Sequence, residues 1–181
     1  MMESLLTDRL LLIPLTLQDV DQIQLKFPVW EVVKYLDASA VPWPYPADGA
    51  LTFVRDIALP KMQCGSRFFW SIRPKVSPET LIGVINLACD TDDHRGFWLS
   101  PVWQGQGLIT EASDAVTHFW FTQLDQPYLR VTKAVSNKAS AAISRKNGMR
   151  LVATQERDYV SGHFQTEIWE ISREEWLRNK R

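Results

Sequence analysis

The chain has 181 residues, of which 45% are hydrophobic, and its formal net charge at pH 7 is −1. This length and composition predict one folded domain over residues 1–181 and exclude a disordered chain. Without a net positive charge or a long basic run, the sequence also argues against binding nucleic acid through bulk electrostatics.

The N-terminal segment, the two cysteines and the three histidines argue against further classes of protein. MMESLLTDRLLLIPL has no basic segment before its apolar run, and no stretch of about 18 apolar residues follows, so we expect neither a signal peptide nor a membrane span. Cys64 and Cys89 cannot build a disulfide framework, which favours a reducing, cytoplasmic setting. The three histidines are too scattered for a zinc site, so no metal is expected.

The first third of the chain predicts one strand and several short helices. The apolar run at 9–15 reads as a strand, and TLQD from Thr16 resembles a capping box before a helix that reaches Phe27. Shorter helical patterns follow at 31–35 and at 48–62, the latter with Asp48 in position to cap it. Between them, three prolines in VPWPYP (41–46) force an extended loop.

The remainder alternates strands with two longer helices. Strands are predicted at 67–73, 81–88, 95–99, 128–135, 150–160 and 163–171, and helices at 109–120 and 139–146 with a last helical turn at 172–177. Asn147-Gly148 is a helix stop, and Ser161-Gly162 is a hairpin turn. The order predicts an α/β (α+β) domain with a mixed, mostly antiparallel sheet, flanking helices and one parallel strand pair.

WQGQGLITEA, which begins at Trp103, places two glycines just before a helix. Glycines there let an anion reach the free N–H groups of the helix N-terminus. No Gly-x-x-x-x-Gly-Lys string is present, and Thr110 replaces the third glycine of a dinucleotide-binding loop. The remaining pattern is a pyrophosphate loop, Gln/Arg-x-x-Gly-x-Gly/Ala, in which Gln104, Gly107 and Ile109 stand at the three defined positions.

Two blocks of the sequence resemble one enzyme family. FWLSPVWQGQGLITEA resembles the acetyl-CoA-binding motif of the GNAT N-acetyltransferases, in particular the ribosomal-protein N-terminal acetyltransferase branch (RimJ/RimL-like). VSNKASAAISRKNGM (135–149) is similar to that branch's second motif, with Asn137, Ser140, Lys146 and Gly148 in register. The resemblance covers nearly the whole chain, but Ile109 stands where the family prefers Gly or Ala.

The resemblance implies acetyl-CoA as cosubstrate and a place for it. The pantetheine arm would lie between the strands at 96–99 and 129–135, which run side by side and then splay apart, and backbone N–H groups of the glycine loop would hold the pyrophosphate. The implied cofactor-binding residues are Trp98, Leu99, Ser100, Gln104, Gly105, Gln106, Gly107, Leu108, Ile109, Thr110, Asn137 and Ser140.

The catalytic candidates each carry a structural alternative. The motif places a hydroxyl at Ser140, which would protonate the leaving thiolate or else cap its helix. Glu167, beside apolar neighbours in a strand, is a candidate general base or a water-facing edge residue. Glu111 is interpreted as a helix-start carboxylate that pairs with an arginine, with a catalytic role as the alternative. Cys89 is expected to be a small core residue rather than an acyl-transfer nucleophile.

The sequence is compatible with more than one acceptor of the acetyl group. The pocket candidates are the aromatics Trp30, Trp43, Tyr45, Trp70 and Tyr159. The acceptor of the acetyl group is expected to be a protein N-terminal amine, as on a ribosomal protein, with a small-molecule amine as the alternative. A third hypothesis is a CoA-binding module without turnover. CDTDD (89–93) would supply an acidic mouth or form a solvated turn, and the chain would be a monomer or a homodimer.

Overall fold

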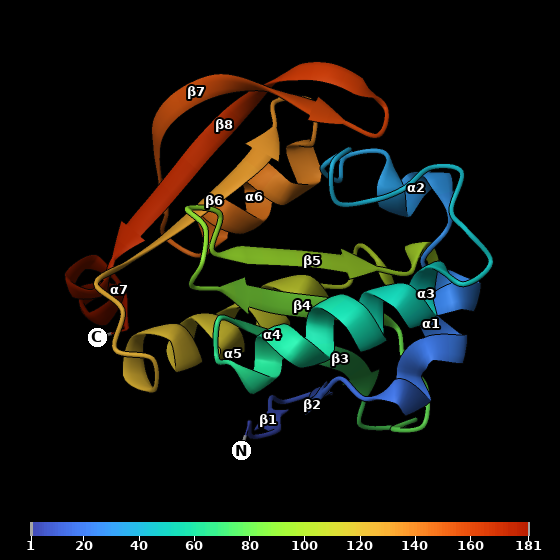
Figure 1. The fold of residues 1–181 in the computed structure, drawn as a ribbon. Coiled ribbons are helices and arrows are strands. Elements are labelled where there is room, and N and C mark those ends of the chain that lie inside the picture. Colours follow the sequence, from blue (N-terminus) through green and yellow to red (C-terminus); the bar gives the residue numbers. More distant parts are fainter. Residues whose placement is uncertain (1, 181) are drawn as a thin grey trace.

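The computed structural model describes residues 2–180, and its strands form two sheets (Figure 1). The larger sheet has the order β1-β2-β3-β4-β5 and the smaller one the order β6-β8-β7, with every strand pair antiparallel. The strands are β1 (Leu5–Leu6), β2 (Leu10–Pro14), β3 (Arg67–Pro74), β4 (Gly83–Ala88), β5 (Arg95–Leu99), β6 (Tyr128–Ala134), β7 (Arg150–Tyr159) and β8 (Gly162–Ser172).

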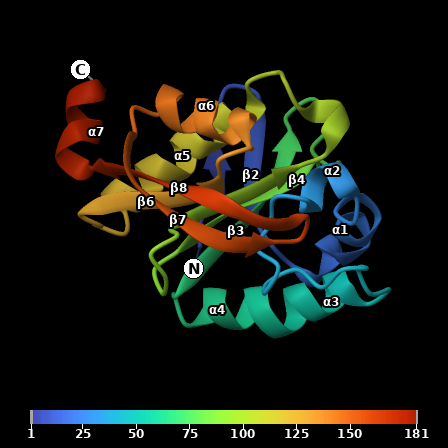
Figure 2. The ribbon, with the colours of Figure 1, turned by 90° about the horizontal axis from the view of Figure 1, so that it is seen from above.

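Helices cover both faces of the larger sheet (Figure 2). They are α1 (Val20–Lys26), α2 (Trp30–Val33), α3 (Gly49–Thr52), α4 (Leu59–Gln63), α5 (Leu108–Thr122), α6 (Lys138–Lys146) and α7 (Arg173–Asn179). Helices α1 to α4 lie on one side, with a π-helical turn joining α3 to α4, and α5 and α6 lie on the other. The predicted α/β class with antiparallel strands and flanking helices is confirmed.

Local sequence explains where the helices begin and end. Thr16 and Asp19 form the predicted capping box at the turn that leads into α1. Gly148, with φ +78°, ends α6 as expected of a left-handed residue after a helix. Asp48 stands at the N-cap of α3 but makes no side-chain cap hydrogen bond. The predicted cap is therefore wrong, and the Gln24 Oε1 accepts the Ala50 N–H instead, at 2.9 Å.

The two sheets meet only at the start of β5 and β6. His94 N donates to Arg130 O at 2.8 Å, but Asp93 Oδ1 then accepts the Thr132 N–H at 3.0 Å. The carboxylate of Asp93 thus takes the place of a β5 carbonyl, and the two strands diverge in the same general direction (Figure 1). Among residues 2–180 no strand pairs with the open edge of β5, so its backbone groups face the gap.

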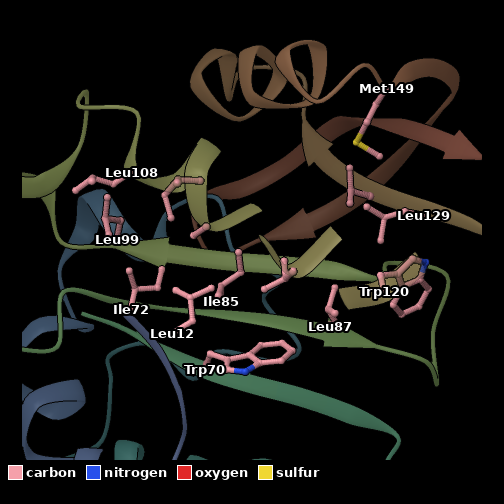
Figure 3. Close-up of a cluster of buried hydrophobic side chains, with 14 of the residues drawn as sticks. Leu12, Trp70, Ile72, Ile85, Leu87, Leu99, Leu108, Trp120, Leu129 and Met149 are labelled. Carbon is pink, nitrogen blue, oxygen red and sulfur yellow. The ribbon is translucent and has the colours of Figure 1, made fainter. Parts of the chain in front are cut away.

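The main core joins the larger sheet to α5 and continues to the smaller sheet, as Leu129 and Met149 show in Figure 3. Trp70 and Trp120 are almost completely buried there, and Trp70 Nε1 donates to Glu3 O at 3.0 Å. Trp70 is labelled among the packed side chains of Figure 3 and does not line either cavity described below. Its prediction as a pocket residue is wrong, because its inward position on the central strand β3 turns the indole into the core.

Candidate active site

A glycine loop presents the free N-terminus of α5. Gly105 and Gly107 have φ values of +76° and +77°, which L-residues with a side chain rarely adopt. Gly107 is the N-cap of α5, and no side chain caps this 15-residue helix. Its first N–H groups and the positive end of its dipole are therefore available to an anion.

Contacts with Arg9, just before β2, hold this loop in place. Glu111, in the first turn of α5, accepts hydrogen bonds from Arg9 N at 2.7 Å and Arg9 Nε at 2.8 Å. Arg9 Nη1 donates in turn to Gln106 O at 3.0 Å. The predicted pairing of Glu111 with an arginine is confirmed, and it fixes the loop to the start of β2.

A cavity of about 580 Å³ opens between the glycine loop and α6. It is lined by predicted cofactor residues from both motifs, namely Trp98, Leu99, Gln104, Gly105, Gly107, Ile109, Thr110, Asn137 and Ser140. The three others do not line it. Ser100 and Leu108 are buried, and Gln106 is exposed with its carbonyl bound to Arg9.

A second cavity of about 250 Å³ adjoins the first in the gap between the diverging strands. Its walls come from the segment after α2, from β5 and β6, and from the end of β7, including Tyr159. The residues that line both cavities are Tyr35, Leu36, Phe97, Asn137 and Ser140. A group held in one cavity and a group held in the other therefore meet beside Ser140.

Ser140 lies in the first turn of α6, above a buried lysine. Asn137 Oδ1 accepts the Ser140 N–H at 3.2 Å, so Asn137 caps the helix and Ser140 is not its cap. Lys133, only 5% exposed, donates to Ser140 O at 2.9 Å, to Ser140 Oγ at 3.2 Å and to Ser144 Oγ. Burial, with a smaller effect of the Arg95 guanidinium, lowers the pKa of Lys133 to about 7.

Three lysines stand around the larger cavity. Lys34, which also pairs with Glu31 at 2.8 Å, lies on the side of α2, and Lys138 and Lys146 lie at the two ends of α6. Together with the N-terminus of α5 they make this cavity suited to a ligand with several phosphate groups.

The comparisons with known proteins agree with this geometry. The profile of the acetyltransferase (GNAT) domain matches residues 9–150. The chain belongs to the GNAT acetyltransferase family. Both motif blocks, the glycine loop and the start of α6, fall within the matched residues.

Solved structures share the fold at low sequence identity. RimL, a ribosomal L7/L12 α-N-protein acetyltransferase in complex with coenzyme A, is 19% identical, with a TM-score of 0.79 over 94% of this chain and 98% of its own. Mycobacterium smegmatis RimJ, solved with a CoA disulfide, is 15% identical, with a TM-score of 0.82 over 96% and 88%. MccE, a microcin C7 self-immunity acetyltransferase solved with acetyl-CoA and AMP, is 17% identical, with a TM-score of 0.77 over 91% and 93%.

Several residues predicted for this acetyltransferase site lie outside it. Glu167 lines neither cavity; β8 is the middle strand of its sheet, and Glu167 Oε2 accepts the Trp169 indole N–H at 2.9 Å. The structure therefore gives no support to Glu167 as the base. Cys89 was expected in the core rather than in the site, and that expectation is wrong: it follows the end of β4, is exposed and lines neither cavity.

The predicted pocket aromatics separate into three groups. Tyr159 lines the second cavity as predicted, and its hydroxyl lies 2.7 Å from Thr166 Oγ1. Trp30 and Trp43 contact each other with tilted rings, whose centroids are 6.0 Å apart, and remain 46% and 42% exposed. Tyr45 packs edge-on against Phe27 and lines neither cavity.

Of the acidic run after β4, only Asp93 lines the second cavity, and each of its aspartates is paired with a neighbour. Asp90 pairs with Lys61 and Arg67 at 2.6 and 2.7 Å. Asp92 pairs with Arg130 at 3.2 Å, and Asp93 accepts from Thr132 and lies 3.3 Å from Arg157 Nη1. Each carboxylate is therefore neutralised by a neighbour. Within residues 2–180, no acidic, histidine or cysteine cluster could hold a metal ion, and no helix is long and apolar enough to cross a membrane.

The second cavity and the buried Lys133 were not predicted from the sequence. Lys133 follows Leu129 and Val131 at two-residue spacing, and all three are buried on the same face of β6. A lysine in phase with an apolar strand face is a sequence pattern that could have identified it. The second cavity had no such pattern, because residues 35–41 and 157–159 are far from the motifs in the chain.

Proposed function

We propose that this enzyme transfers the acetyl group of acetyl-CoA to a protein N-terminal α-amine, such as that of a ribosomal protein, by direct attack of the amine. The observation that carries the proposal is the pair of adjoining cavities that share Ser140. One cavity has the features of a phosphate-bearing ligand site, and the other reaches the same point from the opposite side.

The larger cavity fits CoA. The free N–H groups at the start of α5 and the lysines Lys34, Lys138 and Lys146 would hold its phosphates. The open edge of β5 offers backbone donors and acceptors to the amides of the pantetheine arm. When bound, acetyl-CoA supplies a thioester, whose carbonyl is the electrophile and whose thiolate is the leaving group.

Ile109 is compatible with this binding. Its side chain packs into the core and is 7% exposed, while its backbone belongs to the first turn of α5. The branched side chain therefore turns away from the phosphates, and the N–H remains available to them. Ile109, in place of the family's Gly or Ala, therefore leaves its backbone N–H free to contact a phosphate.

Ser140 is the proton donor for the leaving thiolate. Asn137 fixes the first turn of α6, so Ser140 Oγ is held at the boundary of the two cavities. A hydroxyl there donates to the sulfur as negative charge develops on it. The acceptor needs little help, because an α-amine with pKa near 7.7–8.0 is neutral in on the order of a tenth of molecules at pH 7.

Two observations support a protein N-terminus as the acceptor. The second cavity, about 250 Å³, is smaller than the roughly 300 Å³ or more of usual small-molecule pockets, and suits the end of a chain that continues outside. The structural neighbour RimL, at 19% identity, is a ribosomal L7/L12 α-N-protein acetyltransferase. Such an acceptor places the enzyme in the cytoplasm.

The test is acetyl-CoA thiol release with peptides that begin with free Ser, Ala or Met, alongside amino sugars, polyamines and amino acids. Mass spectrometry of the peptide locates the acetyl group. The proposal predicts acetylation of the N-terminal nitrogen and no acetylation of an N-terminally blocked peptide. Turnover of small amines alone would move the function to metabolite acetylation. CoA binding without turnover of any acceptor would instead indicate a binding module.

A further inference from the structure

The amine of Lys133 is buried in the proposed active site without a carboxylate partner. It lines the second cavity, and within residues 2–180 no acidic side chain lies within ion-pair distance of its Nζ. A buried lysine without a carboxylate partner costs stability, so its presence at this position calls for a physical reason. The hydrogen bonds that it makes supply one.

The three donors of Lys133 are directed at α6. One reaches Ser140 O at 2.9 Å, one reaches Ser140 Oγ at 3.2 Å, and one reaches Ser144 Oγ. The Ser140 oxygen therefore accepts from the lysine on its inner side. Because the hydroxyl has one proton and its inner lone pair is occupied, that proton is directed away from Lys133, toward the cavities that Ser140 lines.

We propose, on the basis of the proposed function, that Lys133 is a positioning residue that acts through Ser140. It holds the Ser140 hydroxyl with its proton toward the leaving sulfur and then replaces that proton. As the thiolate leaves, the Ser140 O–H bond breaks and an S–H bond forms. At the same time a Lys133 N–H bond breaks and a new Ser140 O–H bond forms. Lys133 becomes a neutral amine, Ser140 is unchanged, and the proton released by the acceptor nitrogen restores Lys133 through water.

The electrostatic surroundings of Lys133 suit this exchange. The Arg95 guanidinium on β5 and Arg145 on α6 disfavour its charge, and Asp93 before β5 and Glu167 on β8 favour it. Burial is the largest influence, and the result is a pKa of about 7. A group that titrates near the working pH is an effective proton donor and also takes its proton back readily, unlike a lysine with a pKa near 10.4.

Ser144 provides a matched control on the same helix. It accepts from the same Lys133 Nζ and is fully buried, but it lines neither cavity. If Lys133 only supported α6, loss of Ser144 or of Ser140 would have similar consequences. If Lys133 acts through Ser140, loss of Ser140 changes the pKa of the CoA thiol and loss of Ser144 does not.

The experiment is a titration of the thiol of CoA bound to the full chain, followed by the ultraviolet absorbance of the thiolate, which requires no acceptor. Wild type is compared with Lys133→Met, Ser140→Ala, the double variant and Ser144→Ala. We expect Lys133→Met and Ser140→Ala each to raise the pKa of the bound thiol by about one unit, a tenfold change in thiolate fraction at a given pH. The double variant should match either single variant, and Ser144→Ala should match wild type.

Three outcomes would overturn the inference: an unchanged thiol pKa in Lys133→Met, additive shifts in the double variant, or a shift in Ser144→Ala as large as that in Lys133→Met. The melting temperature and CoA affinity of each variant show that it is folded and loaded. Failure of the proposed function has a different result, since peptides would then show no acetylation while the thiol titration kept the predicted order. A chain that binds no CoA would overturn both.

Discussion

Helices α5 and α6 flank the same opening, but they contact the sheets through different kinds of side chain. The buried face of α5 carries Ala112, Val116 and Trp120, each at most 1% exposed, in the main apolar core, in which Figure 3 labels Trp120. The buried face of α6 carries Ala141 and Ser144, and the Ser144 hydroxyl accepts a hydrogen bond from the buried Lys133 of β6. The buried contacts of α5 are mainly apolar, with one hydrogen bond from Arg95 Nη1 to Thr117 Oγ1 at 2.8 Å. Those of α6 combine the apolar Ala141 with the hydrogen bonds that Lys133 donates.

The difference corresponds to what each helix does in the proposed reaction. Helix α5 binds phosphate through backbone N–H groups, which need a rigid helix and no particular side chain. Helix α6 contributes the Ser140 hydroxyl, which needs a polar group behind it. Most of the buried apolar side chains thus lie on the cofactor side, and the buried lysine that bonds to Ser140 lies on the side of proton transfer.

The largest expected effect is on the apolar side. Trp120→Ala removes a side chain that is 1% exposed, together with the hydrogen bond from Trp120 Nε1 to Tyr128 O at 2.8 Å. We expect the free energy of unfolding in urea to fall by about 3–5 kcal/mol. A loss below about 1 kcal/mol would show that the contacts beneath α5 are not the main source of its stability.

Ile109→Ala separates the stability of α5 from its proposed binding of phosphate. The substitution removes buried methyl groups and should cost about 2–4 kcal/mol of unfolding free energy. CoA affinity, measured by calorimetry below the melting transition, should stay within about threefold of wild type, because the backbone N–H is retained. A large loss of affinity would mean that the side chain, not the backbone, holds the cofactor.

Lys133→Met, unlike the two substitutions in α5, should increase the free energy of unfolding at pH 7. The folded-state pKa of about 7 lies below the unfolded value near 10.4, so burial of the charged amine destabilises the fold fully below pH 7. That cost is relieved as the pH rises from 7 toward 10, where the unfolded chain binds the extra proton. At pH 7 the variant should be more stable than wild type, on the order of 1–4 kcal/mol, even though its activity falls.

The pH dependence provides the check on this prediction. The difference in unfolding free energy between Lys133→Met and wild type should shrink steadily between pH 7 and pH 10 in parallel denaturant titrations. A variant that is less stable at pH 7, with a gap that does not depend on pH, would show that Lys133 is an ordinary structural residue.

The smallest effect is expected at the start of α6. Asn137→Ala removes the cap that accepts the Ser140 N–H and should cost about 1 kcal/mol. Asn137→Asp keeps an oxygen acceptor at that position and serves as the control. If thermal melts show the two variants to be equally destabilised, the cap does not stabilise α6.

Sequence periodicity predicted most of the fold, and its failures have physical reasons. The helices and strands were found because their apolar spacing matches their burial, as for Leu129 and Val131 on β6. The short β1 was missed because two residues carry no period. Trp70 was misplaced because an aromatic side chain is equally consistent with a core and a pocket until the strand's inner face is known.

Only the part of the site that consists of contiguous motifs could be predicted from the sequence. The glycine loop and the start of α6 are contiguous motifs, so their chemistry can be read along the chain. The second cavity is built by segments that only the fold brings together, among them Tyr35, Arg157 and Tyr159. Glu167 was expected to be either a general base or a water-facing residue of an edge strand, and strand order, which makes β8 the middle strand, is a property of the whole sheet.

The central claim is that acetyl transfer takes place beside Ser140, where the two cavities meet. Steady-state kinetics of peptide-dependent thiol release by Ser140→Ala, with CoA affinity measured on the same preparation, tests it most directly. The account predicts a fall in kcat of about 100-fold, with CoA affinity and the peptide KM nearly unchanged, as for loss of a positioned proton donor. A variant with wild-type kcat, or one that loses only CoA affinity, would contradict it.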